Sequence, residues 1–183
     1  MDFISSRWKL ISVLNAVFFG VAMGVSLAAG LFSSPVVYYG QRVYALPDFL
    51  YSSLPLMILF IFCFNLVVSA FTVVTLPGFL FFPLSVALLV FRAVLWGLML
   101  CQLTIGSFLA ALPTLLLEGE AYVFAAGVGT LVGYSWLKKT DDLSRSEVFA
   151  QAIKKYMNAY IFVILLLVGA AIVESATIML LQM

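Results

Sequence analysis

The sequence predicts an all-α protein, a polytopic bundle of transmembrane helices. Of its 183 residues, 65% are hydrophobic and only 9% are charged, whereas a soluble domain is roughly half apolar and a quarter charged. Its apolar runs reach the ~20 residues that a helix needs to cross the ~30 Å hydrocarbon core of a bilayer. Too few charged residues remain to cover a water-facing surface, which excludes a soluble globular domain and a disordered chain.

The first predicted span covers residues 10–32. Arg7 and Lys9 precede it, and Trp8 is a residue type that sits at the membrane interface. The run is longer than the ~7–15 apolar residues of a signal-peptide core and lacks a clear small-residue cleavage site. We therefore interpret it as a retained span, followed by an interfacial loop rich in tyrosine.

The second predicted span, 54–76, ends at a proline–glycine pair and leads into a long apolar region, 78–112. That region would extend ~52 Å as one helix, too long for one upright crossing and short for two. One crossing at 78–100 followed by a re-entrant segment or half-helix at 101–112 fits this length, and such a segment must be covered by protein. The fourth and fifth predicted spans are 113–137 and 156–181.

The distribution of basic residues favours five spans over six. Arg7 and Lys9 precede the first span, and five more basic residues lie near the polar stretch 138–155: Lys138, Lys139, Arg145, Lys154 and Lys155. The positive-inside rule places both groups in the cytoplasm, which requires an even number of crossings between them. We therefore expect an integral protein of the cell membrane with its N-terminus in the cytoplasm, and a six-span bundle stays open as the alternative.

The polar stretch 138–155 also carries a helix signal. Ser144-Arg145-Ser146-Glu147 matches a capping box, in which a serine and a glutamate satisfy the first backbone N–H groups of a helix. Phe149, Ile153 and Tyr156 follow at helical spacing beside two lysines. We interpret this stretch as an amphipathic helix that lies on the inner membrane surface and leads into the last span.

Polar residues within the apolar runs form a candidate intramembrane site: Asn65, Arg92, Glu118, Glu120 and Glu174. A charge at the centre of a bilayer costs at least ~2.5–3.5 kcal/mol, so such side chains tend to face the bundle interior. Two interpretations stay open. The glutamates form a proton- or cation-binding site, or Arg92 neutralises one glutamate in a structural pair.

Small residues predict faces of close helix packing. Gly20 and Gly24 form a small-xxx-small motif in the first span. A second stripe runs along the fourth span at four-residue intervals: Ala121, Ala125, Gly129 and Gly133. We expect both faces to pack within one subunit, and a dimer interface is the alternative.

The sequence gives no support for several functional classes. The chain has no histidine, so histidine metal sites and Ser-His triads are excluded. No catalytic residue, cofactor or metal site is expected. The net charge of +1 predicts no nucleic-acid partner. Cys63 and Cys101 lie in apolar runs and are interpreted as buried thiols.

The order of short motifs over the last two thirds of the chain resembles a known family, that of stage II sporulation protein M. The segments that carry this resemblance are Ile61-Phe62-Cys63-Phe64-Asn65, Leu76-Pro77-Gly78 with Pro83, Arg92-Ala93-Val94-Leu95-Trp96-Gly97, Pro113-Thr114-Leu115-Leu116-Leu117-Glu118-Gly119-Glu120-Ala121 and Ala170-Ala171-Ile172-Val173-Glu174. Arg92 stands where the family has asparagine, and Thr114 where it has histidine. The family glutamate aligns with Glu118, or with Glu120 at an offset of two.

The resemblance implies a non-enzymatic membrane component that holds partners in a larger complex. We accordingly expect the chain to contact the lipid bilayer and a membrane-protein partner or a second copy of itself. Transport of a proton, cation or small solute through the glutamates is the alternative, and an intramembrane enzyme is the third hypothesis.

Overall fold

The computed structural model describes residues 2–31, 47–138 and 144–180. Within these ranges all regular structure is helical, which confirms the all-α prediction. The elements are α1 (Asp2–Gly30), η1 (Asp48–Ser52), α2 (Leu54–Cys63), η2 (Phe64–Thr75), α3 (Leu76–Leu80), α4 (Phe82–Leu100), α5 (Ile105–Tyr134), η3 (Ser135–Leu137), α6 (Arg145–Tyr156), η4 (Met157–Ala159) and α7 (Tyr160–Leu180).

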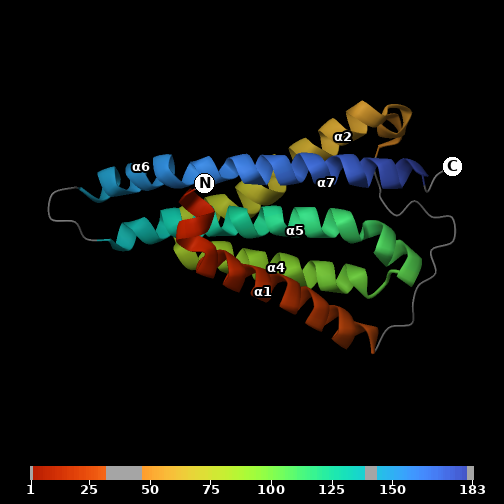
Figure 1. Ribbon diagram of the computed structural model, residues 1–183, viewed down its shortest axis with the longest axis horizontal. Coiled ribbons are helices and arrows are strands. Elements are labelled where there is room, and N and C mark those ends of the chain that lie inside the picture. Colours follow the sequence, from red (N-terminus) through yellow and green to blue (C-terminus); the bar gives the residue numbers. More distant parts are fainter. Residues whose placement is uncertain (1, 32–46, 139–143, 181–183) are drawn as a thin grey trace.

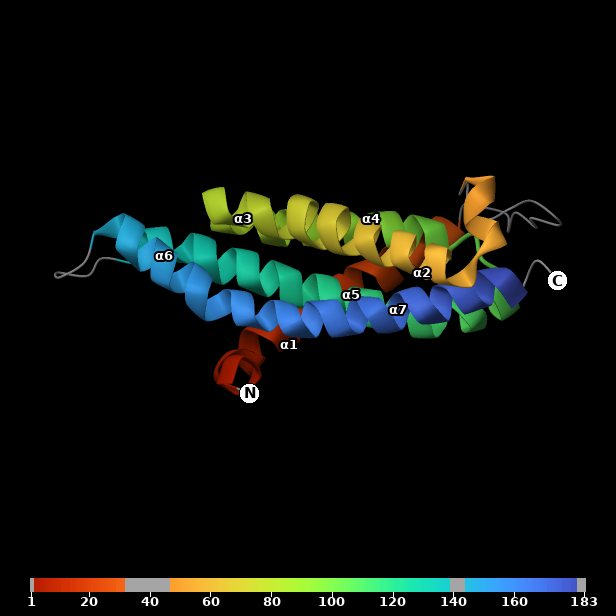
Figure 2. The ribbon, with the colours of Figure 1, turned by 90° about the horizontal axis from the view of Figure 1, so that it is seen from above.

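Five helical stretches of the described chain are long and apolar enough to cross a membrane, the number that the sequence predicts. They are Arg7–Gly30, Leu54–Leu80, Phe82–Leu100, Ile105–Leu137 and Arg145–Leu180. They run side by side along the long axis of the molecule, with α5 in the middle and α2 leaning on α7 (Figure 1; Figure 2). The last two stretches extend roughly 50 Å at 1.5 Å per residue, so they exceed the hydrocarbon thickness and project beyond it.

The predicted boundary between the third and fourth spans is wrong. Residues 101–104 form the turn, and residues 105–112 are the first turns of α5 rather than a separate re-entrant segment. Thr104 fixes this start, because its Oγ1 accepts a hydrogen bond from Ser107 N at 3.2 Å. Pro113 then lies inside α5. It removes a single backbone donor, and neighbouring helices stabilise a membrane helix that contains such a proline.

The boundary between the second and third spans also differs from the prediction. The helix continues through Pro77 and breaks at Phe81, whose backbone is extended (φ −149°, ψ 108°). Pro77 lies within the continuous helical stretch Leu54–Leu80, where η2 passes into α3, whereas Pro83 occupies the first turn of α4. A proline is tolerated at the start of α4 because the first-turn N–H groups have no partner within the helix.

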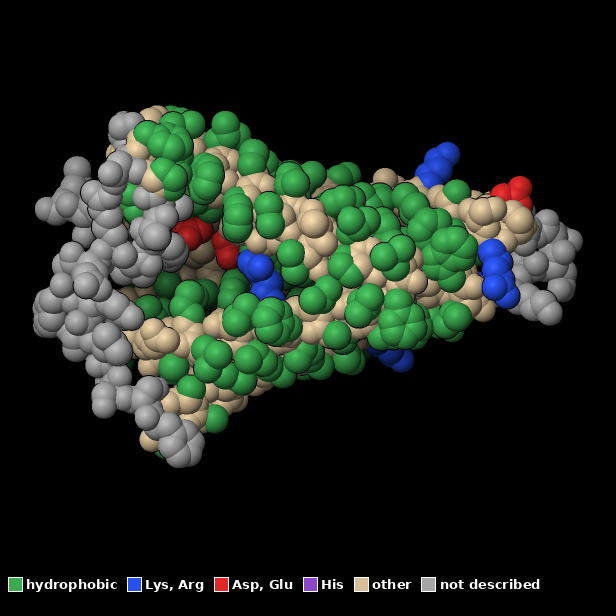
Figure 3. Space-filling view, turned by 180° about the vertical axis from the view of Figure 1, so that it is seen from behind, with side chains coloured by type: hydrophobic (Ala, Val, Ile, Leu, Met, Phe, Trp, Pro, Cys, Tyr) green, Lys and Arg blue, Asp and Glu red, His purple; other side chains and the backbone are tan. Residues whose placement is uncertain are grey.

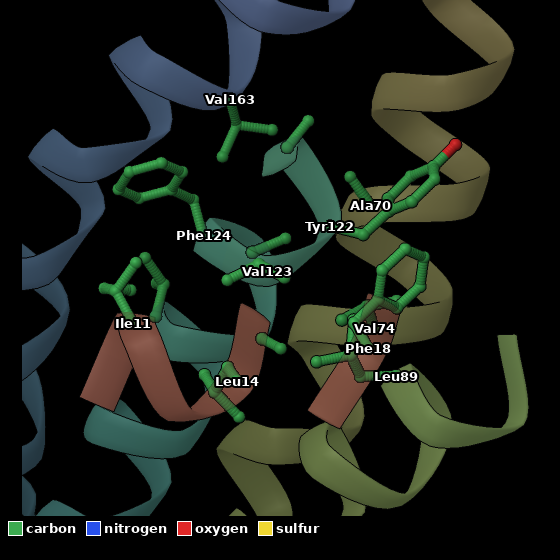
Figure 4. Close-up of a cluster of buried hydrophobic side chains, with 14 of the residues drawn as sticks. Ile11, Leu14, Phe18, Ala70, Val74, Leu89, Tyr122, Val123, Phe124 and Val163 are labelled. Carbon is green, nitrogen blue, oxygen red and sulfur yellow. The ribbon is translucent and has the colours of Figure 1, made fainter. Parts of the chain in front are cut away.

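The central helix is α5. Every residue from Ala121 to Gly129 is buried, because α1, η2, α3, α4 and α7 all pack against this part of α5. Side chains from these helices meet around Val123, as Figure 4 shows for Phe18, Val74 and Val163. The other spans each expose much of their surface, which suits contact with lipid.

Glycine lets neighbouring backbones touch α5. A Cβ atom at Gly129 would meet Ser85 Oγ and lie 2.8 Å from the Thr75 carbonyl oxygen, and one at Gly133 would collide with the Gly78 carbonyl. Gly20 and Gly24 differ: both are exposed on α1, with no described neighbour within 4 Å of a built Cβ. The close packing within one subunit that we expected at these two residues is therefore not made by the described part of the chain.

The helix predicted in the polar stretch forms as α6, and its capping box is present. Ser144 Oγ accepts from Glu147 N at 3.4 Å, and Ser144 N donates to Glu147 Oε2 at 2.8 Å. Phe149 stacks on Trp136 with ring centres 4.5 Å apart. This contact holds α6 alongside the end of α5, so α6 continues the line of α7 through η4 (Figure 1; Figure 2).

The cysteines are less buried than predicted. Cys63 is exposed and Cys101 is half-buried, and neither is in a disulfide. Cys63 lies on the outer face of α2, where a thiol meets lipid as a small apolar group.

Gly133→Ala is expected to destabilise the protein by about 1–3 kcal/mol, because the added methyl overpacks the contact with the Gly78 carbonyl. Gly20→Ala is the matched control. It has open space and gains up to about 1 kcal/mol of helix propensity. Thermal unfolding in detergent, followed by circular dichroism, measures both changes, and equal melting temperatures for the two variants would contradict the packing described.

Candidate functional site

Seven polar side chains, from all five spans, lie inside the bundle and are called the polar network here. They form two groups, one around Glu118 and the other the pair Asn15–Glu120, which are joined through the backbone of α5. α5 supplies Glu118, Glu120 and Tyr122, and the other spans supply Asn15 (α1), Asn65 (η2), Arg92 (α4) and Glu174 (α7). Each helix places its residue well inside its apolar run. Ionisable groups are most costly at this depth, so the network must satisfy them internally.

Glu118 is 8% exposed and takes its strongest hydrogen bond from another span. Asn65 Nδ2 donates to Glu118 Oε1 at 2.5 Å, and Asn65 Oδ1 accepts from the Tyr122 hydroxyl at 3.1 Å. Hydrogen bonds to a carboxylate are shorter and stronger than those between neutral groups. Asn65 therefore joins η2 to two residues one turn apart on α5 and uses both halves of its amide.

Arg92 acts on the glutamates through Tyr122. Its Nη2 donates to the Tyr122 hydroxyl at 2.8 Å, and its guanidinium lies 4.0 Å from the centre of the Tyr122 ring. A cation over an aromatic face is attracted by the negative charge of the ring. The positive charge also acts on Glu118 through space. Arg92 is thus linked to Glu118 by a chain of hydrogen bonds through Tyr122 and Asn65, in place of the direct pair that the sequence predicts.

The three glutamates turn to different helices. Glu174 is half-buried on α7, and its carboxyl group lies beside that of Glu118, close enough for the two to share a hydrogen bond. Two carboxyl groups can share a hydrogen bond only when one of them carries a proton, since an ionised carboxylate has no donor. Glu120 instead faces α1, where Asn15 Nδ2 donates to Glu120 Oε2 at 3.2 Å. The structure therefore brings Glu118 and Glu174 together and leaves Glu120 on a neighbouring side of α5.

Aromatic rings fill the space between α1, α4 and α5 beside the network. Trp96 packs edge-on against Phe18 and Tyr122, with ring centres 5.2 Å and 6.0 Å apart. Gly119 admits the rings of Phe18 and Phe19, since a Cβ there would lie 2.7 Å from Phe19. These rings support the Tyr122 side chain and limit its choice of rotamer.

The opposite side of the network is less tightly filled. Acidic and basic side chains are visible together in a hollow on the face that Figure 3 presents, beside residues that the structure does not describe. Arg92 Nε and Asn15 Oδ1 are buried without a hydrogen-bond partner among the described atoms. Buried polar atoms of this kind usually bind water or an ion, so the network has one donor and one acceptor that can each make a further hydrogen bond.

Asn65 sits on an unusual helix. The whole of η2 is a π-helix of 12 residues, and the hydroxyls of Thr72 and Thr75 donate to carbonyls five residues back. The single proton of the Thr75 hydroxyl is shared between Ala70 O and Ala125 O, at 3.0 Å and 2.9 Å, and the Tyr160 hydroxyl lies 2.5 Å from the same oxygen. π-Helical turns are rare and often occur at functional sites. Here the wider helix places Asn65, Ser69 and Thr75 on the buried side.

Sequence reasoning found five of the seven network residues and missed Asn15 and Tyr122. A signal for Tyr122 was present, because residues four apart lie on one helix face and Tyr122 follows Glu118 at that spacing. Asn15 is a single amide in an apolar run, and its partner could not be read from the sequence. The small-residue stripe Ala121, Ala125, Gly129 and Gly133 is buried along α5 beyond the network.

A sequence model described as stage II sporulation protein M matches residues 13–177. The chain belongs to the stage II sporulation protein M family. The match runs from α1 almost to the end of α7 and includes every residue of the network. Comparisons with curated proteins and with solved structures found no match. Within the described residues, no three cysteine, aspartate or glutamate side chains converge as a metal site.

Asn65→Leu is expected to destabilise the protein by about 2–3 kcal/mol, because Glu118 loses a charge-assisted hydrogen bond in a buried site. The double variant with Glu118→Leu should lose less than the sum of the single variants, since removing both partners leaves no orphaned group. Asn158→Leu, on the exposed side of η4, is the control. Thermal unfolding in detergent gives the four values, and strict additivity would show that the two side chains are not coupled.

Proposed function

We propose that this protein is a non-enzymatic component of a larger complex in the cell membrane, with its N-terminus in the cytoplasm. The observation that carries the proposal is the polar network, to which all five spans contribute. Such a network fixes the relative positions of the spans, because each acid is stable only while its donor on another helix stays in place. A fixed bundle suits a protein that holds partners.

The orientation follows from the basic residues at one end of the bundle. Arg7 Nη2 donates to the Tyr156 hydroxyl at 3.4 Å, which places the start of α1 beside the junction of α6 and α7. Lys154 and Lys155 immediately precede that junction. Both basic groups of the sequence thus lie at the same end, the arrangement that the positive-inside rule assigns to the cytoplasm.

The non-enzymatic proposal rests on how the polar groups are used. An active site needs a nucleophile or base whose reactive atom faces a substrate. In this network Asn65, Tyr122 and Arg92 bond one another and the glutamates, and aromatic rings cover one side. The family name carries a link to sporulation, which we do not extend to this chain.

The surface that suits a partner helix lies on α1. Small residues recur there at four-residue intervals on an exposed face: Ser12, Ala16, Gly20, Gly24 and Ala28. Small side chains let two membrane helices approach closely, so that the helices make more van der Waals contacts with each other. A membrane-protein partner or a second copy of this chain would seat a helix on this face.

A photo-crosslinking residue at Met23, which is 48% exposed on α1, is expected to capture one defined partner in native membranes. The same residue at Leu165, 63% exposed on α7, is the control and should give only diffuse lipid products. Gly24→Leu should weaken the Met23 product at least several-fold without lowering the melting temperature, because the added side chain blocks close approach. Equal capture at both positions would contradict a partner on α1.

Transport is a second candidate function, favoured by the neighbouring carboxyl groups of Glu118 and Glu174. A shared proton between carboxyl groups on two helices can be released and regained, as proton relays in membrane proteins require. The hollow beside the network and its unpartnered polar atoms would give water access to the pair. Under this proposal the substrate is a proton or a small cation.

Glu118→Gln and Glu174→Gln are each expected to abolish proton flux into proteoliposomes if the pair carries transport. Glutamine keeps the shape but cannot exchange a proton. Glu147→Gln, the same change in the exposed capping box of α6, should leave flux unchanged. A pH-sensitive dye inside the vesicles measures the rate. Wild-type flux no faster than in protein-free vesicles would rule transport out.

A further inference from the structure

The start of α1 and the end of α6 bring two cations to one tyrosine. α1 bends at Arg7, so its first turn crosses the direction of the bundle (Figure 1; Figure 2). Arg7 Nη2 donates to the Tyr156 hydroxyl at 3.4 Å, and Lys155 Nζ lies 5.7 Å from the centre of the Tyr156 ring. Exposed Lys9 and Lys154 flank the two cations along the chain.

These cations lack an acidic partner among the described side chains. Glu118, Glu120 and Glu174 belong to the network inside the bundle, and Glu147 is held by Ser144 at the far end of α6. Like charges repel strongly beside a medium of low dielectric constant, where water screens them poorly. An anion bound near Tyr156 would offset that repulsion.

The surroundings match the depth of a lipid headgroup. Trp8 is 57% exposed next to Arg7, and tryptophan prefers the level of the headgroups. Exposed apolar side chains begin one to two turns further into the membrane, with Val13 on α1 and Ile161 on α7, and Leu165 follows one turn after Ile161. A molecule with a phosphate beside the cations and acyl chains along these side chains would contact both surfaces at once.

We propose that Arg7 and Lys155, which meet at the buried Tyr156 and are flanked by Lys9 and Lys154, bind the phosphate headgroup of an anionic phospholipid in the inner leaflet. The site joins the first and last spans through the lipid, at the point where Arg7 hydrogen-bonds Tyr156. Basic pockets between membrane helices on the cytoplasmic side are known to suit such headgroups.

The test is a lipid titration of the purified full chain in detergent, with the melting temperature as readout. Phosphatidylglycerol should raise the melting temperature, because a ligand that binds the folded state stabilises it in proportion to its occupancy. Phosphatidylcholine, which has a phosphate but no net charge, should raise it far less. Inorganic phosphate, the soluble source of the same chemistry, should have no effect at millimolar concentration.

Variants separate this site from a general attraction to the basic end. Arg7→Gln with Lys155→Gln should weaken the phosphatidylglycerol response about fivefold for each charge removed. Lys138→Gln with Arg145→Gln removes the same charge at the opposite end of α6 and should leave the response unchanged. An equal loss in both double variants, an equal response to phosphatidylcholine, or an equal response to inorganic phosphate would each overturn the proposal.

Discussion

Burial of the Glu118 carboxyl in the middle of a membrane bundle constrains the rest of the structure. Hydrocarbon offers no water to solvate it, so its hydrogen bonds must come from neighbouring helices. Asn65 supplies one from η2 at 2.5 Å, and Glu174 supplies another contact from α7. Arg92 balances the charge through Tyr122. Because these partners lie on separate spans, the position of Glu118 couples the packing of α5 to that of its neighbours.

The central place of α5 follows from this requirement together with the size of its side chains. A helix surrounded on all sides must carry both the polar groups that bind its neighbours and small residues where backbones touch it. The polar groups of α5 lie around Glu118. Its small residues include Gly129 and Gly133, where the backbones of Thr75 and Gly78 approach. The π-helix η2 lies at the same contact, and its Thr75 hydroxyl bonds the Ala125 carbonyl of α5. Hydrogen bonding and close backbone packing thus both join η2 to α5.

Local patterns predicted what depends on local physics. Apolar run lengths predicted the all-α class, the distribution of basic residues favoured five spans, and the capping box at Ser144 predicted the start of α6. The prolines gave wrong span boundaries, because Pro77 and Pro113 were interpreted as breaks although both lie inside continuous helical stretches. Depth in the membrane identified Glu118, Glu174 and Arg92 as candidates. The missed residues are Tyr122, which bonds Arg92, and Asn15, which bonds Glu120. Their pairing depends on how helices rotate against one another, and no single run of sequence contains that information.

A fixed anchor and a proton carrier place opposite demands on the same network. An anchor needs its hydrogen bonds satisfied in one arrangement, and the bonds from Tyr122 through Asn65 to Glu118 meet that demand. A carrier needs a second arrangement of similar energy, which requires spare donors or acceptors for the groups that move. Those spare groups lie at the edges of the network, on Arg92 Nε and Asn15 Oδ1, and not on Asn65 or Glu118. The centre of the network therefore favours the anchor, and any motion would have to begin where Asn15 meets Glu120.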